Sequence, residues 1–466
     1  MPFYSAGCLY ILRISINHGL IVNMSEKIVS KFGGTSNATG ESTRQCLELA
    51  GDSHIVIGSA PGKIEAPGLD GQKVTQLLLD VHTVYAGSHN FDESRISAIV
   101  GRFEQVAGVA GTLSGKWIDD IAVRARNSAQ YGAAAASILG ERLMAEIYES
   151  TGYELLDPIT AGHDLGADKD AWESWLGRVC IPGKRYVLPG NTTVVNSTLT
   201  DFERGGSDIS AGLAAYGVHA DLHWNNTDGC ALSADPTKID RSRLNEIEHL
   251  LYVEGRELGR NGTGLVHPAA MVPLMIGNIP THIRSSFDPD ATITVVDNNY
   301  DRASRRSGFP VAVSLMDNVS IHDVQVPGMA ESVGMLAHIE KALRESAIPL
   351  IDSESGGADG QRYLVRSSDS EAAASAIRLA IPEHGTSRSV DGLSLLSLVG
   401  YNLGNRKADI MVHMLFNLNN HDPKAWQKGG HTLLIGQHVA RVTVDREHAQ
   451  RELEKLHEIT LESRTA

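Results

Sequence analysis

The chain has 466 residues, of which 42% are hydrophobic and 21% charged, and its formal net charge is −15. This length is too great for one hydrophobic core, and the composition is that of a multidomain globular protein rather than of a disordered chain. The negative charge argues against nonspecific nucleic-acid binding, so an anionic substrate would need a local basic pocket.

The first 23 residues and the cysteines bear on where the protein works. Residues 1–23 contain a short apolar run that Arg13 interrupts, and no basic region precedes it. This pattern favours a wrongly assigned start codon or a disordered extension over a targeting segment. No stretch approaches the roughly 20 apolar residues of a membrane span. The cysteines are scattered and form no metal-binding pair, so we expect a cytoplasmic protein without structural zinc; they are Cys8, Cys46, Cys180 and Cys230.

From about residue 27 to residue 293, apolar strands alternate with helical stretches. The pattern predicts a helix at 41–50, a mostly helical region at 91–150, and strands at 27–31, 54–58, 185–188, 220–224 and 279–284. Such alternation is typical of an α/β fold with a largely parallel sheet sandwiched by helices. Ligands of these folds bind at the carboxyl ends of the strands.

Two glycine turns fall at such positions. Residues 31–36 (KFGGTS) follow the first strand and place a lysine beside backbone N–H groups that glycine leaves unhindered. Residues 204–208 (RGGSD) open a helix, which Ser207 or Asp208 could cap. Neither turn has the spacing of a P-loop or of a dinucleotide-binding fingerprint. Together they predict a phosphate site of another kind.

The last third of the chain differs in its pattern. Residues 297–308 lack periodicity and are rich in turn formers, so we expect a linker whose arginines are solvated. Beyond it, two units each show a strand, helix, strand, strand, helix order, as in ferredoxin-like βαββαβ domains, including a helix at 407–418. The predicted division is an extension at 1–23, an α/β domain at 24–296, a linker at 297–309 and two small domains at 310–385 and 386–466.

Several short motifs follow one another along the chain. They are KIVSKFGGTS at 27–36, SAPGK at 59–63, KVT at 73–75, GE at 140–141, RGGSD at 204–208, ADP at 234–236, VHP at 266–268 and IRSSF at 283–287. In this order they resemble the aspartate kinases of the amino-acid kinase superfamily, from about Met24 to the end of the chain. The two terminal units resemble that family's tandem ACT domains.

The resemblance implies ATP-dependent phosphorylation of the side-chain carboxylate of L-aspartate, with Mg²⁺ bound to the nucleotide. It implies catalytic roles for Lys31 and Asp208, of which Asp208 would orient Lys31 or help to hold the magnesium-nucleotide complex. The implied aspartate ligands are Ser59, Thr75, Glu141 and Arg204. The implied nucleotide ligands are Lys31, Gly33, Gly34, Gly205, Gly206, Ser207, Asn226 and Asp235.

The chain departs from the family's pattern on the nucleotide side. Asn225 and Asn226 stand where the family has Thr-Asp, Thr237 stands for an arginine, and Gly264 stands for a lysine. Loss of charge-assisted bonds, worth ~1.5–3 kcal/mol each, would weaken ATP binding. Either Lys238 or Arg241 could compensate.

These departures leave two alternatives to an aspartate kinase. One is a non-catalytic amino-acid-sensing subunit, and the other is a kinase acting on another small amino or carboxylic acid. The ACT resemblance further implies a homodimer or larger assembly and lysine or threonine as a feedback effector, whereas a purely structural role for residues 311–462 is the simpler alternative.

Overall fold

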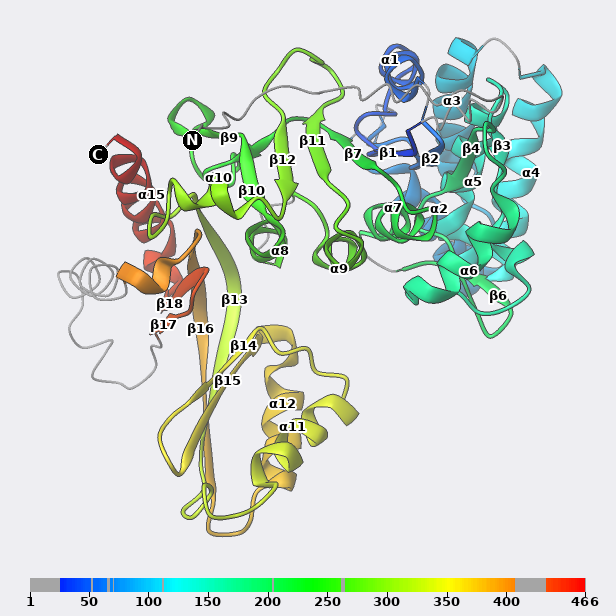
Figure 1. The fold of residues 1–466 in the computed structure, drawn as a ribbon. Helices are drawn as coiled ribbons and strands as arrows, with labels where there is room; N and C mark the ends of the chain where they lie inside the picture. The colour runs from blue at the N-terminus through cyan, green and yellow to red at the C-terminus, as the bar shows by residue number, and fades with distance from the viewer. Residues whose placement is uncertain are drawn as a thin grey trace, which may run out of the picture.

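The computed structural model describes residues 26–51, 53–64, 68–69, 71–110, 113–202, 205–260, 265–406 and 433–465. Within these residues it shows a large α/β domain followed by an antiparallel unit (Figure 1). None of the helices in this part of the chain combines the length and the apolar character that crossing a membrane requires.

The α/β domain is built on an eight-stranded sheet in the order β10-β12-β11-β7-β1-β2-β4-β3. Neighbouring strands are parallel except β11 and β12, so the predicted fold class is confirmed. The bounds are β1 (Ile28–Phe32), β2 (Ile55–Gly58), β3 (Glu154–Leu155), β4 (Tyr186–Pro189), β7 (Leu222–Thr227), β10 (His249–Leu251), β11 (Thr281–Ser285) and β12 (Thr294–Asp297). Two small hairpins lie outside this sheet, β5 (Thr193–Val195) with β6 (Thr198–Thr200) and β8 (Ala231–Leu232) with β9 (Glu246–Ile247).

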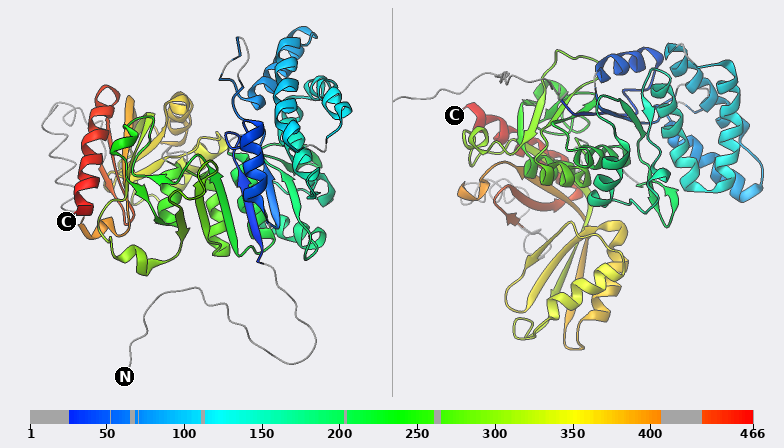
Figure 2. Two further views of the ribbon diagram at one scale, coloured as in Figure 1. Left: turned by 90° about the horizontal axis from the view of Figure 1, so that it is seen from above. Right: turned by 45° about the vertical axis from the view of Figure 1, so that its right-hand side comes forward.

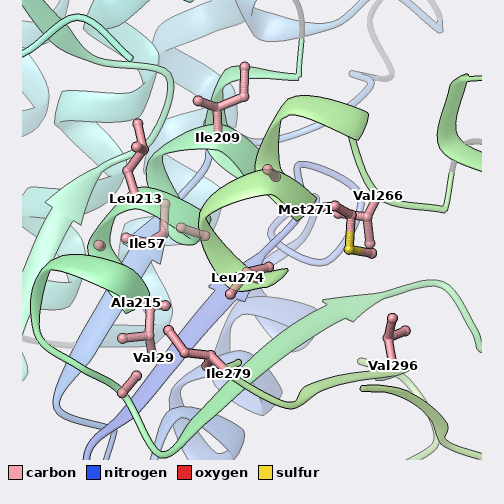
Figure 3. Packing of buried hydrophobic residues seen from close by; sticks show 14 of the residues in the cluster. Val29, Ile57, Ile209, Leu213, Ala215, Val266, Met271, Leu274, Ile279 and Val296 are labelled. Carbon is pink, nitrogen blue, oxygen red and sulfur yellow. The ribbon is translucent and has the colours of Figure 1, made fainter. Parts of the chain in front are cut away.

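Helices cover both faces of the sheet, because successive strand residues point to opposite sides. Val29 of β1 belongs to a core that includes Leu213, Met271 and Leu274 (Figure 3), whereas Phe32 belongs to a core on the other side. The first face carries α6 (Lys169–Val179), α7 (Gly206–Gly217) and α9 (Pro268–Gly277), and α8 (Tyr252–Arg260) packs beside α9. The second carries α1 (Gly40–Ala50), α2 (Val74–Ser88), α3 (Glu93–Ala110), α4 (Gly115–Tyr131) and α5 (Ala133–Glu149).

The C-terminal unit is a six-stranded antiparallel sheet in the order β14-β15-β13-β16-β18-β17. Its elements are β13 (Ala312–Gln325), α11 (Met335–Glu345), β14 (Asp352–Ser355), β15 (Gly360–Arg366), α12 (Ser370–Ala380), β16 (Thr386–Val399), β17 (Leu433–Ile435), β18 (Val439–Asp445) and α15 (Ala449–Thr465). Figure 2 shows α11 and α12 on the part of this unit that projects from the α/β domain. The helix predicted at 407–418 lies outside the described residues.

The two ferredoxin-like units are interleaved rather than consecutive. The long strands β13 and β16 pair from Ala312↔Val399 to Gln325↔Thr386. Residues 319–325 of β13 pair with β15 in the first unit, whereas residues 393–399 of β16 pair with β18 in the second. The structure thus differs from the expected order of two separate units, because each long strand contributes one half to each. An alternating pattern of apolar residues predicts where strands lie in the sequence, but it does not predict which strands pair.

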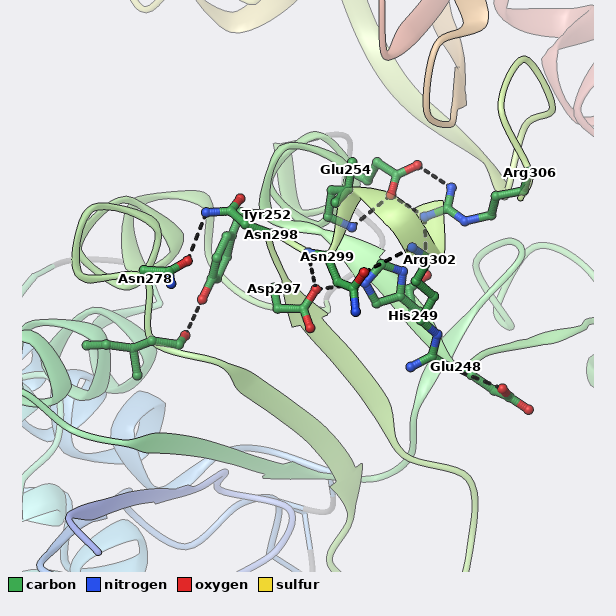
Figure 4. A network of polar contacts seen from close by, with 12 residues as sticks. Glu248, His249, Tyr252, Glu254, Asn278, Asp297, Asn298, Asn299, Arg302 and Arg306 are labelled. Atoms are coloured by element: carbon green, nitrogen blue, oxygen red, sulfur yellow. Dashed lines mark hydrogen bonds and ion pairs between the residues drawn. The ribbon is translucent and has the colours of Figure 1, made fainter. Parts of the chain in front are cut away.

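The segment expected to be a solvated linker is partly helical and ion-paired. Asn299 caps α10 (Tyr300–Ser304) by accepting a hydrogen bond from the amide of Arg302. Arg306 forms a bidentate ion pair with Glu254 of α8, whose side chain is fully buried (Figure 4). A buried carboxylate requires a partner, which is why this arginine is drawn inward.

Candidate active site

A cavity of about 550 Å³ lies at the carboxyl ends of β1 and β2. It is lined by residues from both glycine turns and from the helices of the second face. The lining residues are Lys31, Gly33, Gly34, Thr35, Ser59, Ala60, Pro61, Gly62, Lys63, Lys73, Thr75, Gln76, Leu79, Ser137, Glu141, Asn191, Gly205, Gly206, Ser207 and Asp208. Segments far apart in sequence therefore meet in one pocket, whose charged lining residues are three lysines, one glutamate and one aspartate.

Lys31 and Asp208 form an ion pair inside this cavity. Lys31 Nζ lies 2.7 Å from Asp208 Oδ1, and the two side chains are 11% and 18% exposed. The amide of His267 donates to the other oxygen, Oδ2, at 3.0 Å. Burial raises the pKa of the Asp208 carboxyl, but the charge of Lys31 and these hydrogen bonds outweigh it, so the pKa lies below its ordinary value. Asp208 is therefore an ionised carboxylate that holds the Lys31 ammonium in place.

The first glycine turn is packed against the loop after β2. The amide of Gly62 donates to the carbonyl of Gly34 at 2.7 Å. A Cβ on Gly62 would lie 2.8 Å from that same carbonyl oxygen, and a Cβ on Gly34 would lie 2.9 Å from the carbonyl of Ala60. Glycine at these positions allows the two loops to touch, which keeps the amides of residues 33 and 34 beside Lys31.

Glu141 reaches the cavity from α5. Its Oε2 accepts a 2.8 Å hydrogen bond from the amide of Ala60. The preceding residue, Gly140, lets α5 approach, since a Cβ there would lie 2.9 Å from that of Ala60. Burial raises the pKa of Glu141 to about 8, against the opposing effects of the Ala60 amide and the Lys31 charge. The group is thus a protonated carboxyl near neutral pH that an incoming ammonium would ionise.

Two hydroxyls complete this side of the cavity. Ser59 follows β2, and its Oγ is buried without a hydrogen-bond partner among the described residues. Thr75 stands in the first turn of α2. A buried hydroxyl without a partner costs free energy unless a ligand supplies one. The Ser59 hydroxyl is therefore available to a polar ligand, and Thr75 lines the same cavity.

The second glycine turn leaves the start of α7 open. Gly205 is the N-cap, with φ 65°, and no side chain caps the helix. Capping by Ser207 or Asp208, as expected from sequence, is not observed, because Asp208 is directed to Lys31 and His267. Uncapped N–H groups at a helix N-terminus attract anions. Arg204 lies outside the described residues.

A second cavity, of about 310 Å³, opens at the end of β7, the strand next to β1. Its lining residues are Thr227, Asp228, Gly229, Cys230, Ala231, Leu232, Ala234, Asp235, Pro236, Thr237, Arg241, Leu258 and Leu265. The Asp235 carboxylate accepts hydrogen bonds from the amide and hydroxyl of Thr237, at 2.8 and 2.7 Å. Both cavities therefore lie at the carboxyl ends of neighbouring parallel strands of one sheet.

Asn226 lines neither cavity. Its amide nitrogen donates to the carbonyl of Lys31 at 3.2 Å, and its oxygen accepts from Arg284 Nε at 2.7 Å. Its own carbonyl accepts from the amide of Gly33 at 3.3 Å. The structure thus places Asn226 underneath the Lys31 turn, where its buried side chain supports the turn from β7. Asn225, beside it, donates to the carbonyl of Leu265 at 3.3 Å.

Some polar lining residues have no role that the sequence predicts. Lys63 and Lys73 belong to the SAPGK and KVT motifs, and they meet across an antiparallel bridge at the cavity wall. Asn191 follows β4 with φ 51°, a left-handed conformation that asparagine tolerates. The position of Asn191 at a strand end was a usable signal. Within the described residues, no group of three or more His, Cys, Asp and Glu side chains is placed to hold a metal.

The sequence model of the amino acid kinase family matches residues 26–285, which include the described lining of both cavities. The chain belongs to the amino acid kinase family. The match covers more than half of the 466 residues, from the strand before the Lys31 turn to the end of β11.

This member of the amino acid kinase family is similar to curated aspartokinases. It is 26% identical over 356 residues to a bifunctional aspartokinase/homoserine dehydrogenase of Haemophilus influenzae, covering 69% of this chain and 42% of the relative. It is 25% identical over 361 residues to the chloroplastic aspartokinase 1 of Arabidopsis thaliana (69% and 60%) and 28% identical over 300 residues to aspartokinase 3 of Bacillus subtilis (59% and 64%). The chain thus spans 42% to 64% of the lengths of these relatives.

Solved structures show the same fold. Aspartokinase III of E. coli in complex with aspartate and ADP aligns with a TM-score of 0.74 at 20% identity, covering 94% of this chain and 100% of that one. An aspartate kinase of Clostridium acetobutylicum aligns with a TM-score of 0.69 at 19% identity, covering 93% and 100%. The α/β domain and the C-terminal antiparallel unit therefore follow the architecture of aspartate kinases.

Proposed function

We propose that the protein is an aspartate kinase, which transfers the γ-phosphoryl group of ATP to the side-chain carboxylate of L-aspartate and yields 4-phospho-L-aspartate. The observation that carries this proposal is that one cavity joins the Lys31–Asp208 pair to the buried carboxyl of Glu141. The curated relatives are aspartokinases, and the E. coli neighbour was solved with aspartate and ADP.

Each side of the cavity suits one substrate. The Lys31 ammonium, the amide of Gly34 and the open start of α7 suit phosphates, whereas the amide of Gly33 already donates to the carbonyl of Asn226. Glu141 suits the ammonium of an amino acid, with Ser59 and Thr75 as hydroxyl donors. Arg204, which precedes Gly205 in the sequence, would bind the α-carboxylate.

The chemistry requires alignment rather than a base. The aspartate carboxylate is ionised at neutral pH, so its oxygen can attack the γ-phosphorus while the bond to the ADP oxygen breaks. Lys31 would neutralise charge on the transferring group, and Asp208 fixes its ammonium for that task. Magnesium fits as an ion carried by the nucleotide, with Asp208 as the neighbouring carboxylate; when bound it would neutralise phosphate charge.

Aspartyl-hydroxamate formation tests the proposal, because hydroxylamine traps the acyl phosphate. Wild-type protein with ATP, magnesium and L-aspartate should form the hydroxamate, and Lys31→Ala should lower the rate about a hundredfold or more. Lys184→Ala is the matched control, since Lys184 pairs with Glu154 at the surface. A wild-type protein that binds aspartate without turnover would be a sensing subunit, and turnover only with another acid would change the assigned acceptor.

The antiparallel unit supports a regulatory role within this proposal. We expect it to act as a pair of ACT domains that bind lysine or threonine and that join two or more copies of the chain. Its outer strands β14 and β17 each pair on one side only among the described strands, which leaves edges open to a second copy. Light scattering would measure the assembly, and inhibition by millimolar lysine or threonine would exclude a purely structural role.

A further inference from the structure

The second cavity contains a cation to which the proposed function assigns no role. Arg241 begins the short helix η2 (Arg241–Arg243), which the Asp240 side chain caps. A Cβ built on Gly229 would lie 3.7 Å from Arg241 Nη2, so the guanidinium reaches the turn that follows β7. That turn is on the strand adjacent to β1, which carries Lys31.

Arg241 is the only lysine or arginine among the described lining residues of this cavity. No described carboxylate forms an ion pair with its guanidinium, although Asp228 and Asp235 also line the cavity. The other candidate cation, Lys238, is held 2.6 Å from Asp317 of β13 and is therefore engaged with the antiparallel unit. Thr237, for its part, is bonded to Asp235.

The loop that carries Arg241 is anchored to the antiparallel unit on its N-terminal side. Ala234 and Ile239 lie in a core with Val313 and Leu396 of the antiparallel unit. The carbonyl of Ser233 accepts from the amide of Val313 at 2.9 Å. An arginine on an anchored loop has its backbone position set before a ligand arrives, which lowers the entropy cost of binding.

We infer that Arg241 binds the phosphate chain of the nucleotide and supplies the cation that Thr237 and Gly264 cannot. This inference rests on the proposed function. The apolar part of the cavity, with Leu232, Leu258 and Leu265, suits a purine or its ribose. A guanidinium at the rim matches phosphate oxygens through its planar set of N–H donors.

Calorimetric binding of Mg-ADP and of adenosine to the full chain tests the inference. Arg241→Gln should weaken Mg-ADP binding tenfold or more and leave adenosine binding unchanged. Arg243→Gln is the matched control, because Arg243 lies in the same helix but pairs with Glu458 at the surface. Unchanged Mg-ADP binding in Arg241→Gln, or an equal loss for adenosine, would overturn the assignment. A wild-type chain that binds neither ligand would instead overturn the proposed function.

Cys230 provides an independent measure of where the nucleotide binds. It lines the same cavity and is a partly exposed free thiol, as is Cys180, which does not line it. Mg-ADP should slow alkylation of Cys230 in the wild type and leave Cys180 unaffected. The same Mg-ADP concentration should protect Cys230 poorly in Arg241→Gln. Equal protection in wild type and variant would contradict a phosphate contact by Arg241.

Discussion

Arg441 of β18 forms ion pairs with Glu257 of α8 and with Asp352 of β14, so one guanidinium joins the α/β domain to both halves of the antiparallel unit. Its side chain is 9% exposed, and those of Glu257 and Asp352 are 18% and 24% exposed. This cluster is the most buried ionic link between the two parts of the described chain. Helix α8 precedes His267, whose amide donates to Asp208, so this link is close in sequence to a contact of the Lys31–Asp208 pair.

Arg441→Met should therefore lower the free energy of unfolding by about 3 kcal/mol, because it leaves two partly buried carboxylates uncompensated. Urea unfolding would measure this loss. Arg243→Met removes an exposed pair with Glu458 and should cost at most about 1 kcal/mol. Equal losses for the two variants would contradict a structural role for the buried link.

The segment of residues 297–308, expected to be a linker, offers a second matched comparison. Arg306→Met removes the partner of the fully buried Glu254 and should cost roughly 3–5 kcal/mol. Arg302→Met, four residues earlier, removes a pair with Glu248, which is 77% exposed, and should cost at most about 1 kcal/mol. Thermal or urea unfolding would measure the loss of stability in both variants. The prediction fails if Arg306→Met unfolds as the wild type does.

Glu141 should make the stability of the protein depend on pH. Burial raises the pKa of its carboxyl from 4.5 to about 8, so between these values the native chain binds a proton that the unfolded chain does not. The stabilisation is fully present below pH 4.5 and is lost as pH rises toward 8, by at most about 1.4 kcal/mol per pH unit. Glu141→Gln should remove this slope, whereas Glu104→Gln, at an exposed position of α3, should retain it. Urea unfolding between pH 5.5 and 8.5 measures both; identical slopes in wild type and Glu141→Gln would refute the prediction.

The contact between the two loops of the active site predicts a steric effect. Gly62→Ala would place a methyl group 2.8 Å from the carbonyl oxygen of Gly34, so the Lys31 turn must shift. We expect a loss of about 1–3 kcal/mol in stability and a lower kcat/KM. Gly101→Ala in α3 meets no atom within 4 Å and should instead stabilise by about 0.5–1 kcal/mol. Hydroxamate assays would measure kcat/KM and urea unfolding would measure stability for Gly62→Ala and Gly101→Ala.

Much of the α/β domain could be predicted from sequence because its strands are short apolar runs bounded by turns. The strands predicted at 27–31, 54–58 and 185–188 correspond to β1, β2 and β4. The structure also places both glycine turns at one cavity, and phosphate binding there stays a prediction. These features are local, so the pattern of residue types carries them.

Pairing and partner choice could not be predicted. Nothing in the pattern of residues 386–399 shows that β16 pairs with both β13 and β18, since this depends on distant strands. Arg305 and Arg306 are adjacent in sequence and have nearly the same sequence neighbours, yet only Arg306 pairs with Glu254. The assignment of Asn226 as a nucleotide ligand came from its place in a motif, whereas its hydrogen bonds are to Lys31 and Arg284.

The length of β13 has a mechanical consequence. At ~3.4 Å per residue its 14 residues form a rod of about 45 Å, which starts beside Ser233 at the loop of Arg241 and ends near the tip of the unit. The strand pairs with β16 from Ala312 to Gln325 and with β15 from Val319 to Gln325, so both halves of the antiparallel unit are attached to this one strand. A small molecule that displaced the far end of this strand would therefore also act on Val313, which is hydrogen-bonded to Ser233 beside the second cavity.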